Sequence, residues 1–488
     1  MRESGVILHI SSLPSPYGIG TFGEKAYKFV DFLKKSKLKY WQVLPLNQTS
    51  FGDSPYQSPS AYAGNPYFID LDVLIEEGLL QKSFVDSLDF GDDNLNVDYG
   101  IMFENRYKAL RAAFEKFEKS TAYEEFCVKN SFWLDDYSLF MAIKVENEYK
   151  SFLEWDDLLK LKDEVAIEEF KEKNEKEIDF WKFIQFKCFE QYLKLKTYAN
   201  EQGIKIIGDM PIYVALDSSD VWANKKCFLL DENMTPSLVA GVPPDAFTSD
   251  GQLWGNPIYD WEYLKNNNYI FWEKRIEFAS KMYDLVRIDH FRGFAGYYVI
   301  DAKAENAKDG KWLKGPSIDL FNTLAKSINV SKIIAEDLGY LTEDVYELVA
   351  KTGYMGMKVL QFGLIDEENE YFYKNYPQNT IAYTGTHDNE TTLQCIEKLT
   401  DEQKHIFEKL YKDIDEKSDL DKAIGAVFAS KSQIAIVPMQ DFLKQGEEYR
   451  MNFPSKPNGF WKYRIAENDL NLKLIHRIKH FVKKYDRE

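Results

Sequence analysis

The sequence predicts an α/β protein whose core is a (β/α)8 barrel, the TIM-barrel fold. Two observations predict it: short apolar runs rich in β-branched residues recur along the chain, and segments of helical period separate most of them. Eight strands alternating with helices is the pattern of this barrel. The eight runs are 5–10, 41–46, 204–212, 284–291, 332–339, 357–363, 380–388 and 433–440.

Two intervening segments illustrate the predicted helices. The first, EKAYKFVDFLKKSK (24–37), follows the first run and repeats apolar residues at helical spacing. In the second, TEDVYELVAKTG (342–353), Thr342 is suited to open a helix and Gly353 to close it. Both segments therefore fit the outer layer of a barrel.

The chain is much longer than a barrel requires. A (β/α)8 barrel needs about 250 residues, whereas the chain has 488, so large insertions are expected. We predict a mostly helical insertion at 71–200, between the second and third strands, and further insertions after the third strand (215–260, a loop) and after the fourth (295–330). No repeat or flexible linker divides the sequence, which favours a single domain over 1–488.

Composition narrows the possible partners. The formal net charge of −18 disfavours binding to nucleic acid or to an anionic membrane surface. No signal peptide or run of roughly 20 apolar residues is present, and the four cysteines show neither disulfide nor metal spacing. We therefore expect a cytoplasmic protein that acts on a neutral or cationic substrate.

Acidic residues and histidines stand at the ends of four predicted strands. In a barrel the active site lies at the carboxyl ends of the strands. Carboxylates that lie close together at one end of a barrel repel one another and lower its stability. Their presence at four strand ends therefore indicates function. The residues at these ends are Asp209; Arg287, Asp289 and His290; Glu336 and Asp337; and His387 and Asp388.

Arg287 and Asp289 are two residues apart, so they share one face of a strand. A guanidinium beside a carboxylate lowers its pKa and keeps it ionised, as a nucleophile requires. An ion pair that only closes the barrel core fits the spacing equally well.

Glu336 follows an apolar run, where burial and a neighbouring carboxylate would raise its pKa toward that of a general acid. An ionised nucleophile and a protonated acid about 5–5.5 Å apart cleave a glycosidic bond with retention of configuration. Asp289 and Glu336 lie on adjacent predicted strands, so they are candidates for this pair.

Patterns for other chemistries are missing. The strand-end histidines, His290 and His387, have no metal-ligand spacing, and neither of the glycine-rich nucleotide motifs occurs. We expect neither a metal nor a cofactor.

Two loops are rich in aromatic residues, which suit stacking on sugar rings. The loop 51–68 carries Tyr56, Tyr62 and Tyr67, and the loop 239–259 carries Phe247, Trp254 and Tyr259. Internal packing over the barrel is the alternative, but we favour contact with sugar.

Together these segments resemble the 4-alpha-glucanotransferases of glycoside hydrolase family 77, the amylomaltases or disproportionating enzymes. The matching stretches are SSLPSPYGIGTFG (11–23), SPYQSPSAYAGNPYFI (54–69), IIGDMPIYV (206–214), AGVPPDAFTSDGQLWGNP (240–257), VRIDHFRGF (286–294), IIAEDLG (333–339), TGTHDNET (384–391) and RMNFPSKPNGFW (450–461). They span nearly the whole chain in the right order.

The resemblance implies a role for each candidate residue. Asp289 matches the nucleophile, Glu336 the general acid/base, and Asp388 the third carboxylate, which stabilises the transition state. Arg287, His290 and His387 match residues that support the subsite at the cleavage point. Further positions match residues that line the glucan groove; these are Tyr56, Asp209, Trp254 and Asn452.

The resemblance also implies substrates: maltooligosaccharides and α-1,4-glucans as donors, and glucose or maltooligosaccharides as acceptors, with the protein a monomer or dimer. The stretch 240–257 matches the loop that covers the cleft, although position 247 is Phe where some relatives have Tyr. Two alternatives stay open: an α-amylase-like or debranching hydrolase with the same trio, and a catalytically silent glycan-binding protein.

Overall fold

The protein is described by a computed structural model, which defines residues 2–50, 52–244, 248–339, 341–454, 456 and 459–488. Its centre is a parallel sheet of eight strands in the order β10-β11-β12-β1-β2-β3-β6-β9. Each lies within one of the eight runs, apart from one or two residues at a strand's start, so the predicted fold is confirmed. The strands are β1 (Glu3–Ile7), β2 (Tyr40–Gln42), β3 (Lys205–Pro211), β6 (Leu285–Asp289), β9 (Ile333–Ala335), β10 (Gly356–Val359), β11 (Thr380–Tyr383) and β12 (Ile434–Pro438).

The sheet closes into a barrel between its two end strands. Ile334 of β9 forms a parallel bridge with Met355, and the Ala335 N–H donates to the Met355 carbonyl at 2.9 Å. Alternate side chains therefore face inward or outward. On β12, Ile434 and Ile436 belong to the interior cluster, whereas the intervening Ala435 packs against the outer helices.

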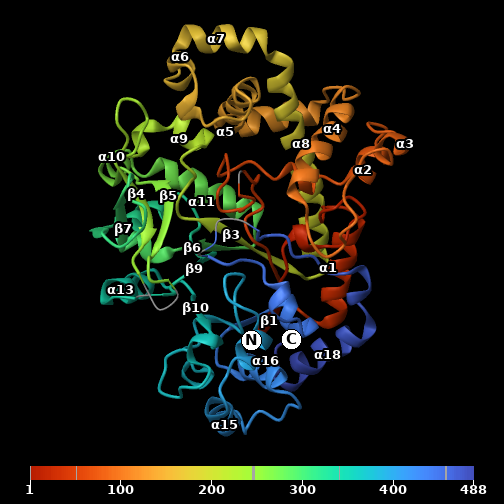
Figure 1. Ribbon diagram of the computed structural model, residues 1–488, viewed down its shortest axis with the longest axis vertical. Coiled ribbons are helices and arrows are strands. Elements are labelled where there is room, and N and C mark those ends of the chain that lie inside the picture. Colours follow the sequence, from red (N-terminus) through yellow and green to blue (C-terminus); the bar gives the residue numbers. More distant parts are fainter. Residues whose placement is uncertain (1, 51, 245–247, 340, 455, 457–458) are drawn as a thin grey trace.

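Helices surround the barrel (Figure 1). They are α1 (Glu24–Ser36), α8 (Glu175–Glu201), α11 (Ile270–Met282), α12 (Ile318–Leu324), α13 (Glu343–Thr352), α14 (Thr392–Glu397), α15 (Asp401–Leu410), α16 (Asp419–Ala429), α17 (Met439–Leu443) and α18 (Leu472–Lys484). Thr342 and Gly353 flank α13 as predicted, and Gly353 has a φ of 70°. The two ends of the chain meet where Arg2 donates to the Tyr485 carbonyl at 2.7 Å.

The segment 71–200 is helical and extends away from the barrel at the top of Figure 1. Before α8 it contains α2 (Leu71–Glu76), α3 (Lys82–Val85), α4 (Tyr99–Phe114), α5 (Thr121–Glu146), α6 (Asp157–Lys160) and α7 (Glu164–Lys173). Side chains of Asp98, Ser120 and Asp163 accept hydrogen bonds from first-turn amides of α4, α5 and α7. These caps fix where the helices begin.

The insertions after β3 and β6 form a second sheet, which was not predicted from the sequence. This antiparallel sheet has the order β5-β4-β7-β8. The segment 215–260, interpreted above as a loop, contributes α9 (Ser219–Ala223), β4 (Leu238–Val242) and β5 (Gln252–Pro257), with α10 (Trp261–Asn266) just after it. The segment 295–330 contributes β7 (Gly296–Asp301) and β8 (Lys311–Lys314). Because these strands pair between two insertions that are distant in the sequence, neither insertion alone shows a pattern that predicts the sheet.

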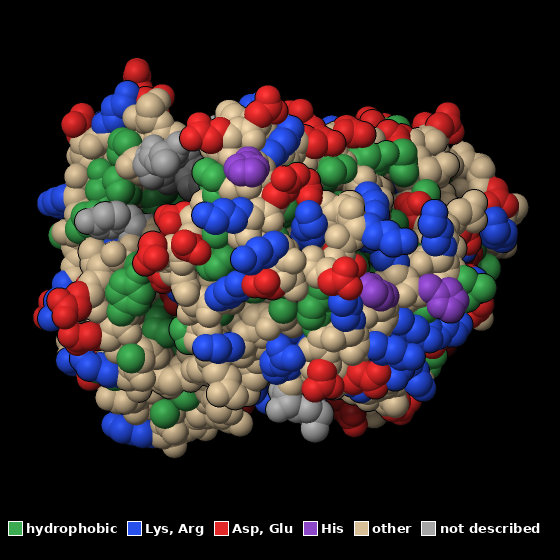
Figure 2. Space-filling model, turned by 90° about the horizontal axis from the view of Figure 1, so that it is seen from below, with side chains coloured by type: hydrophobic (Ala, Val, Ile, Leu, Met, Phe, Trp, Pro, Cys, Tyr) green, Lys and Arg blue, Asp and Glu red, His purple; other side chains and the backbone are tan. Residues whose placement is uncertain are grey.

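Seen from below, the surface mixes charges of both signs (Figure 2). Lys and Arg side chains lie among Asp and Glu across this face, although the chain has 79 acidic and 61 basic residues. None of the described helices is long and apolar enough to cross a membrane.

Candidate active site

Strand register brings Asp209 and Arg287 together inside the barrel. Asp209 on β3 and Arg287 on β6 are direct partners in the parallel pairing. Val286 and Ile288 pack outward, so the alternation turns Arg287 and Asp289 inward. The sequence prediction that these two share a face is confirmed, and the face is the barrel interior.

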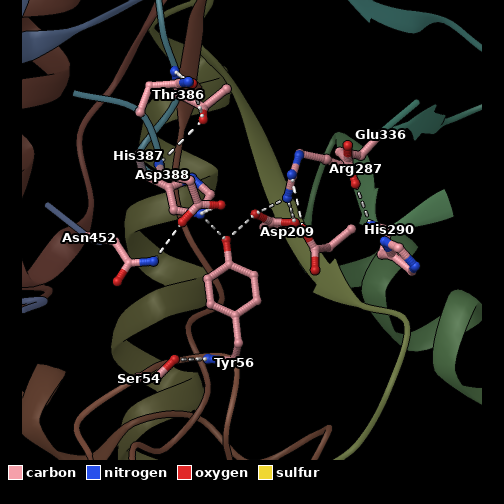
Figure 3. Close-up of polar contacts among 12 residues, drawn as sticks. Ser54, Tyr56, Asp209, Arg287, His290, Glu336, Thr386, His387, Asp388 and Asn452 are labelled. Carbon is pink, nitrogen blue, oxygen red and sulfur yellow. Dashed lines mark hydrogen bonds and ion pairs between the residues drawn. The ribbon is translucent and has the colours of Figure 1, made fainter. Parts of the chain in front are cut away.

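Arg287 contacts two carboxylates at once (Figure 3). Its Nη1 donates to both oxygens of Asp209 at 2.8 and 2.7 Å, and its Nη2 lies 3.0 Å from Asp289 Oδ1. The side chains of Arg287 and Asp209 are buried, whereas that of Asp289 is 28% exposed. Arg287 and Asp209 therefore form the core ion pair, and Asp289 remains open to a ligand.

The expected effect of Arg287 on Asp289 is only partly right. Burial raises the pKa of Asp289 well above its usual range, Arg287 lowers it, and Asp209 and Glu336 raise it further. The prediction of a lowered pKa was wrong because burial raises the pKa more than Arg287 lowers it, and the charges of Asp209 and Glu336 add to the rise.

Glu336 directly follows β9 and accepts two main-chain hydrogen bonds. Its Oε2 accepts from the His290 N–H at 2.7 Å and its Oε1 from the Leu338 N–H at 2.9 Å. Burial raises the pKa of Glu336, Arg287 and these two N–H donors lower it, and Asp388 raises it. The raised pKa expected of a general acid is confirmed. The next carboxylate, Asp337, instead accepts from the Met357 N–H at 2.6 Å and so ties β9 to β10.

His290 is held with one ring nitrogen free. Its φ of 52° is uncommon for a residue other than glycine, and it turns the chain sharply after Asp289. Burial lowers the pKa of His290 to about 3, so its ring is neutral. Nε2 is buried with no hydrogen-bond partner in the described chain, and Trp254 of β5 packs edge-on against the ring at 4.8 Å.

Tyr56 connects the two sides of the site. Its hydroxyl donates to Asp209 Oδ2 at 2.7 Å and lies 2.9 Å from His387 Nε2. Since the hydroxyl proton goes to Asp209, its oxygen accepts from His387 Nε2–H. The two rings also stack with centroids 5.4 Å apart.

Asp388 lies beside His387, in the loop after β11. Its Oδ1 accepts from Asn452 Nδ2 at 2.6 Å, and its Oδ2 is 3.3 Å from His387 Nε2. The Asp388 side chain is 40% exposed. The contacts above join seven of the ten candidate residues in one network, in the order Asn452, Asp388, His387, Tyr56, Asp209, Arg287 and Asp289. Glu336 and His290 form a separate bonded pair, which adjoins this network because His290 follows Asp289 in the chain, and Trp254 packs against His290.

Of the five described aromatic residues named in the loops, two reach this group. Tyr62, Tyr67 and Tyr259 are at most 7% exposed and belong to the main hydrophobic core, so internal packing was the right interpretation for them. Phe247 lies outside the described residues. Among the described aromatic residues of the two loops, Tyr56 and Trp254 contact other candidate residues.

Two residues of the segment 450–461 contact the site although the sequence did not indicate them. Arg450 donates to the main-chain oxygens of Asp388 at 2.7 Å and Asn452 at 2.6 Å. Trp461 packs against Tyr56 and His387 with ring centroids 5.7 and 6.0 Å apart. Both stand in a quoted motif but at no strand end, so position in a barrel gave no signal for them.

The described residues include no group of three or more His, Cys, Asp or Glu side chains that could hold a metal ion. The site contains four carboxyl groups, of Asp209, Asp289, Glu336 and Asp388; Arg287 contacts the first two, and neutral histidines lie beside the others. Such groups transfer protons, attack electrophilic carbon and stabilise positive charge.

The closed barrel and the carboxylates at its strand ends place the chain among the (β/α)8-barrel enzymes. A family model described as 4-alpha-glucanotransferase matches residues 8–470. A 4-alpha-glucanotransferase of Clostridium butyricum is 47% identical over 485 residues, which cover 98% of this chain and 100% of that protein. The chain therefore belongs to the 4-alpha-glucanotransferase family, glycoside hydrolase family 77.

Solved structures agree with this assignment. The structure of amylomaltase from Streptococcus agalactiae in complex with acarbose is 42% identical, covers 100% of both chains and has a TM-score of 0.97. Amylomaltase from Corynebacterium glutamicum shares the fold at 19% identity, with a TM-score of 0.79 over 100% of this chain and 75% of that one.

Proposed function

We propose that the protein is a 4-alpha-glucanotransferase that works by retaining double displacement. It cleaves an α-1,4-glucan or maltooligosaccharide donor and joins the donor fragment to the 4-hydroxyl of glucose or of another glucan. The observation that carries the proposal is the placement of Asp289 and Glu336 at the ends of paired strands, linked by the His290 N–H donated to Glu336.

In the first step a carboxylate oxygen of Asp289 attacks the anomeric carbon of the donor. Glu336 gives its proton to the glycosidic oxygen, so the leaving fragment departs with a 4-hydroxyl and a glycosyl ester remains on Asp289. In the second step Glu336, now ionised, takes the proton from the acceptor 4-hydroxyl, which attacks the same carbon and releases Asp289. Two inversions retain the α configuration.

The other residues assist without forming bonds to the substrate carbon. Asp388 stabilises the positive charge that develops on the sugar ring, and Asn452 holds its carboxylate. His290 donates its main-chain N–H to Glu336 and so helps to hold that carboxyl group in place. Every step uses a carboxyl or a sugar hydroxyl, so the reaction proposed requires no cofactor.

Transfer competes with hydrolysis, because water can attack the ester as well. We propose that the segment 215–260 covers the cleft and that Trp254 holds the acceptor sugar, which favours the acceptor over water. We further propose that the barrel and the helical segment 71–200 form one catalytic domain, active as a monomer or dimer.

Retention can be tested by NMR of the first product formed from maltotriose, whose new linkage must have the α configuration. An initial β product would rule out double displacement. Asp289→Asn should reduce activity to background. Asp284→Asn is the matched control, since Asp284 stands just before the same strand, at its opposite end, where it accepts from the Ile206 N–H at 2.7 Å.

A further inference from the structure

A buried carboxylate behind the site holds both ends of the loop that carries Asp388. Asp441 lies in α17, directly after β12, and is 1% exposed. Its Oδ2 accepts from Thr384 Oγ1 at 2.6 Å and from Thr392 Oγ1 at 2.7 Å, and its Oδ1 accepts from the Thr392 N–H at 2.9 Å. Three donors thus converge on one side chain.

The two threonines mark the boundaries of that loop. Thr384 is the first residue after β11, and Thr392 is the first residue of α14. Both are fully buried. His387 and Asp388 lie between them, so a single carboxylate fixes the start and the end of the segment that carries both.

The anchor is itself fixed, and the loop between its ends is tightly bonded. Arg477 of α18 donates to the Asp441 main-chain oxygen at 3.3 Å. Within the loop, Asn389 Oδ1 accepts from the N–H and the hydroxyl of Thr386 at 2.9 and 2.8 Å. Because these bonds make the loop rigid, a displacement of Thr384 or Thr392 also displaces Asp388.

We propose that Asp441 is a positioning residue for the transfer reaction: by holding Thr384 and Thr392 it sets the orientation of Asp388 and His387 toward the substrate. The inference rests on the proposed function and extends it to a residue outside the substrate cleft. Burying a carboxylate is costly unless strong hydrogen bonds compensate, and an apolar side chain would suffice for packing alone. Ionic hydrogen bonds are shorter and stronger than neutral ones, which suits a clamp that must hold a loop rigidly.

The experiment removes the Thr384 hydroxyl, which bonds Asp441, and compares its effect with that of the same substitution elsewhere on β11. Thr384→Val deletes the bond to Asp441 with nearly the same side-chain shape. Thr380→Val is the matched control: Thr380 begins β11 at the opposite end, is 5% exposed, and loses bonds to the Pro377 carbonyl at 2.6 Å and the Ser432 hydroxyl at 2.7 Å.

Both variants should lower Tm by similar amounts, because each loses buried hydrogen bonds. Only Thr384→Val should lower kcat, by about tenfold, since small misplacements of catalytic groups cost large factors in rate; KM should change little. Thr384→Ser keeps the hydroxyl and should restore kcat. Equal kcat values for Thr384→Val and Thr380→Val, or no recovery in Thr384→Ser, would overturn the proposal.

The test of Asp441 can be distinguished from the test of the proposed function. Wild-type products from maltotriose decide between transfer and hydrolysis, and both reactions break the same bond beside Asp388. The ratio of variant to wild-type kcat therefore tests Asp441 whichever product forms.

Discussion

Arg287 holds Asp209 through a single guanidinium nitrogen, which lies 2.8 and 2.7 Å from the two carboxylate oxygens. Both side chains are almost fully buried. The contact fixes the guanidinium so that its other terminal nitrogen reaches Asp289. The negative charge of Asp209 also raises the pKa of Asp289, so this core pair influences when the nucleophile ionises.

Asp209→Asn should therefore change both stability and pH dependence. Removing one partner of a buried pair costs about 3–5 kcal/mol of unfolding free energy. Activity requires ionised Asp289 and is lost as pH falls through its raised pKa. Loss of the Asp209 charge lowers that pKa, so the acid limb of kcat/KM should move to lower pH. Urea denaturation and a pH-rate profile test this, and an unmoved acid limb contradicts it.

Glu336→Gln should remove proton transfer while leaving the nucleophile. General acid–base catalysis contributes about 10²–10⁴-fold, and kcat on maltotriose should fall within this range. The alkaline limb of the profile should vanish as well, because a raised pKa makes wild-type activity fall when Glu336 ionises. A glucosyl fluoride donor, whose leaving group needs no proton, should lose much less in its first step. Equal losses for both donors would remove Glu336 from the role of acid.

Tyr56→Phe should weaken the link between the two sides of the site. The hydroxyl bonds both Asp209 and His387, and an unpaired buried group costs about 1–3 kcal/mol, so both stability and kcat should fall. Tyr62→Phe is the matched control: Tyr62 stands in the same loop, is 7% exposed, and its hydroxyl makes no hydrogen bond with the described residues. If both variants lose kcat equally, the link has no catalytic role.

Trp254→Ala should raise the ratio of hydrolysis to transfer, since it removes an aromatic surface from the proposed acceptor side. Leu253→Ala on the same strand is the control; Leu253 is 41% exposed and the alternation of β5 turns it to the other face. The measurement is free glucose against longer oligomers made from one donor. An unchanged ratio in Trp254→Ala would exclude this residue from acceptor binding.

Much of this architecture was predictable because the strands of a barrel are short buried segments with a recognisable apolar pattern. Each buried run, such as 433–440, can be recognised without knowledge of the others. The residue that ends a run lies at the carboxyl end of the barrel, where the active site is expected. Asp289 and Glu336 were found in this way. In a closed barrel of eight parallel strands, the order of the runs in the sequence determines which strands are neighbours.

The remainder depended on contacts between distant segments. The strands β4 and β7 pair across 60 residues, and Arg450 reaches Asp388 from a segment with no strand of its own. The pKa of Asp289 was misjudged for the same reason: burial inside the closed barrel raises it, and so does the charge of Asp209, 80 positions away in the sequence. Tyr62 and Tyr259 were read as sugar contacts because sequence alone does not distinguish an aromatic residue in a cleft from one in a core.

The most direct test of the account is the product pattern from maltotriose alone, resolved by chromatography over time. A ladder of longer maltooligosaccharides together with released glucose is the predicted result, and Asp289→Asn should abolish it. Glucose and maltose as the only products would contradict transfer and leave a hydrolase on the same fold. Binding without any reaction would contradict the roles proposed for Asp289, Glu336 and Asp388.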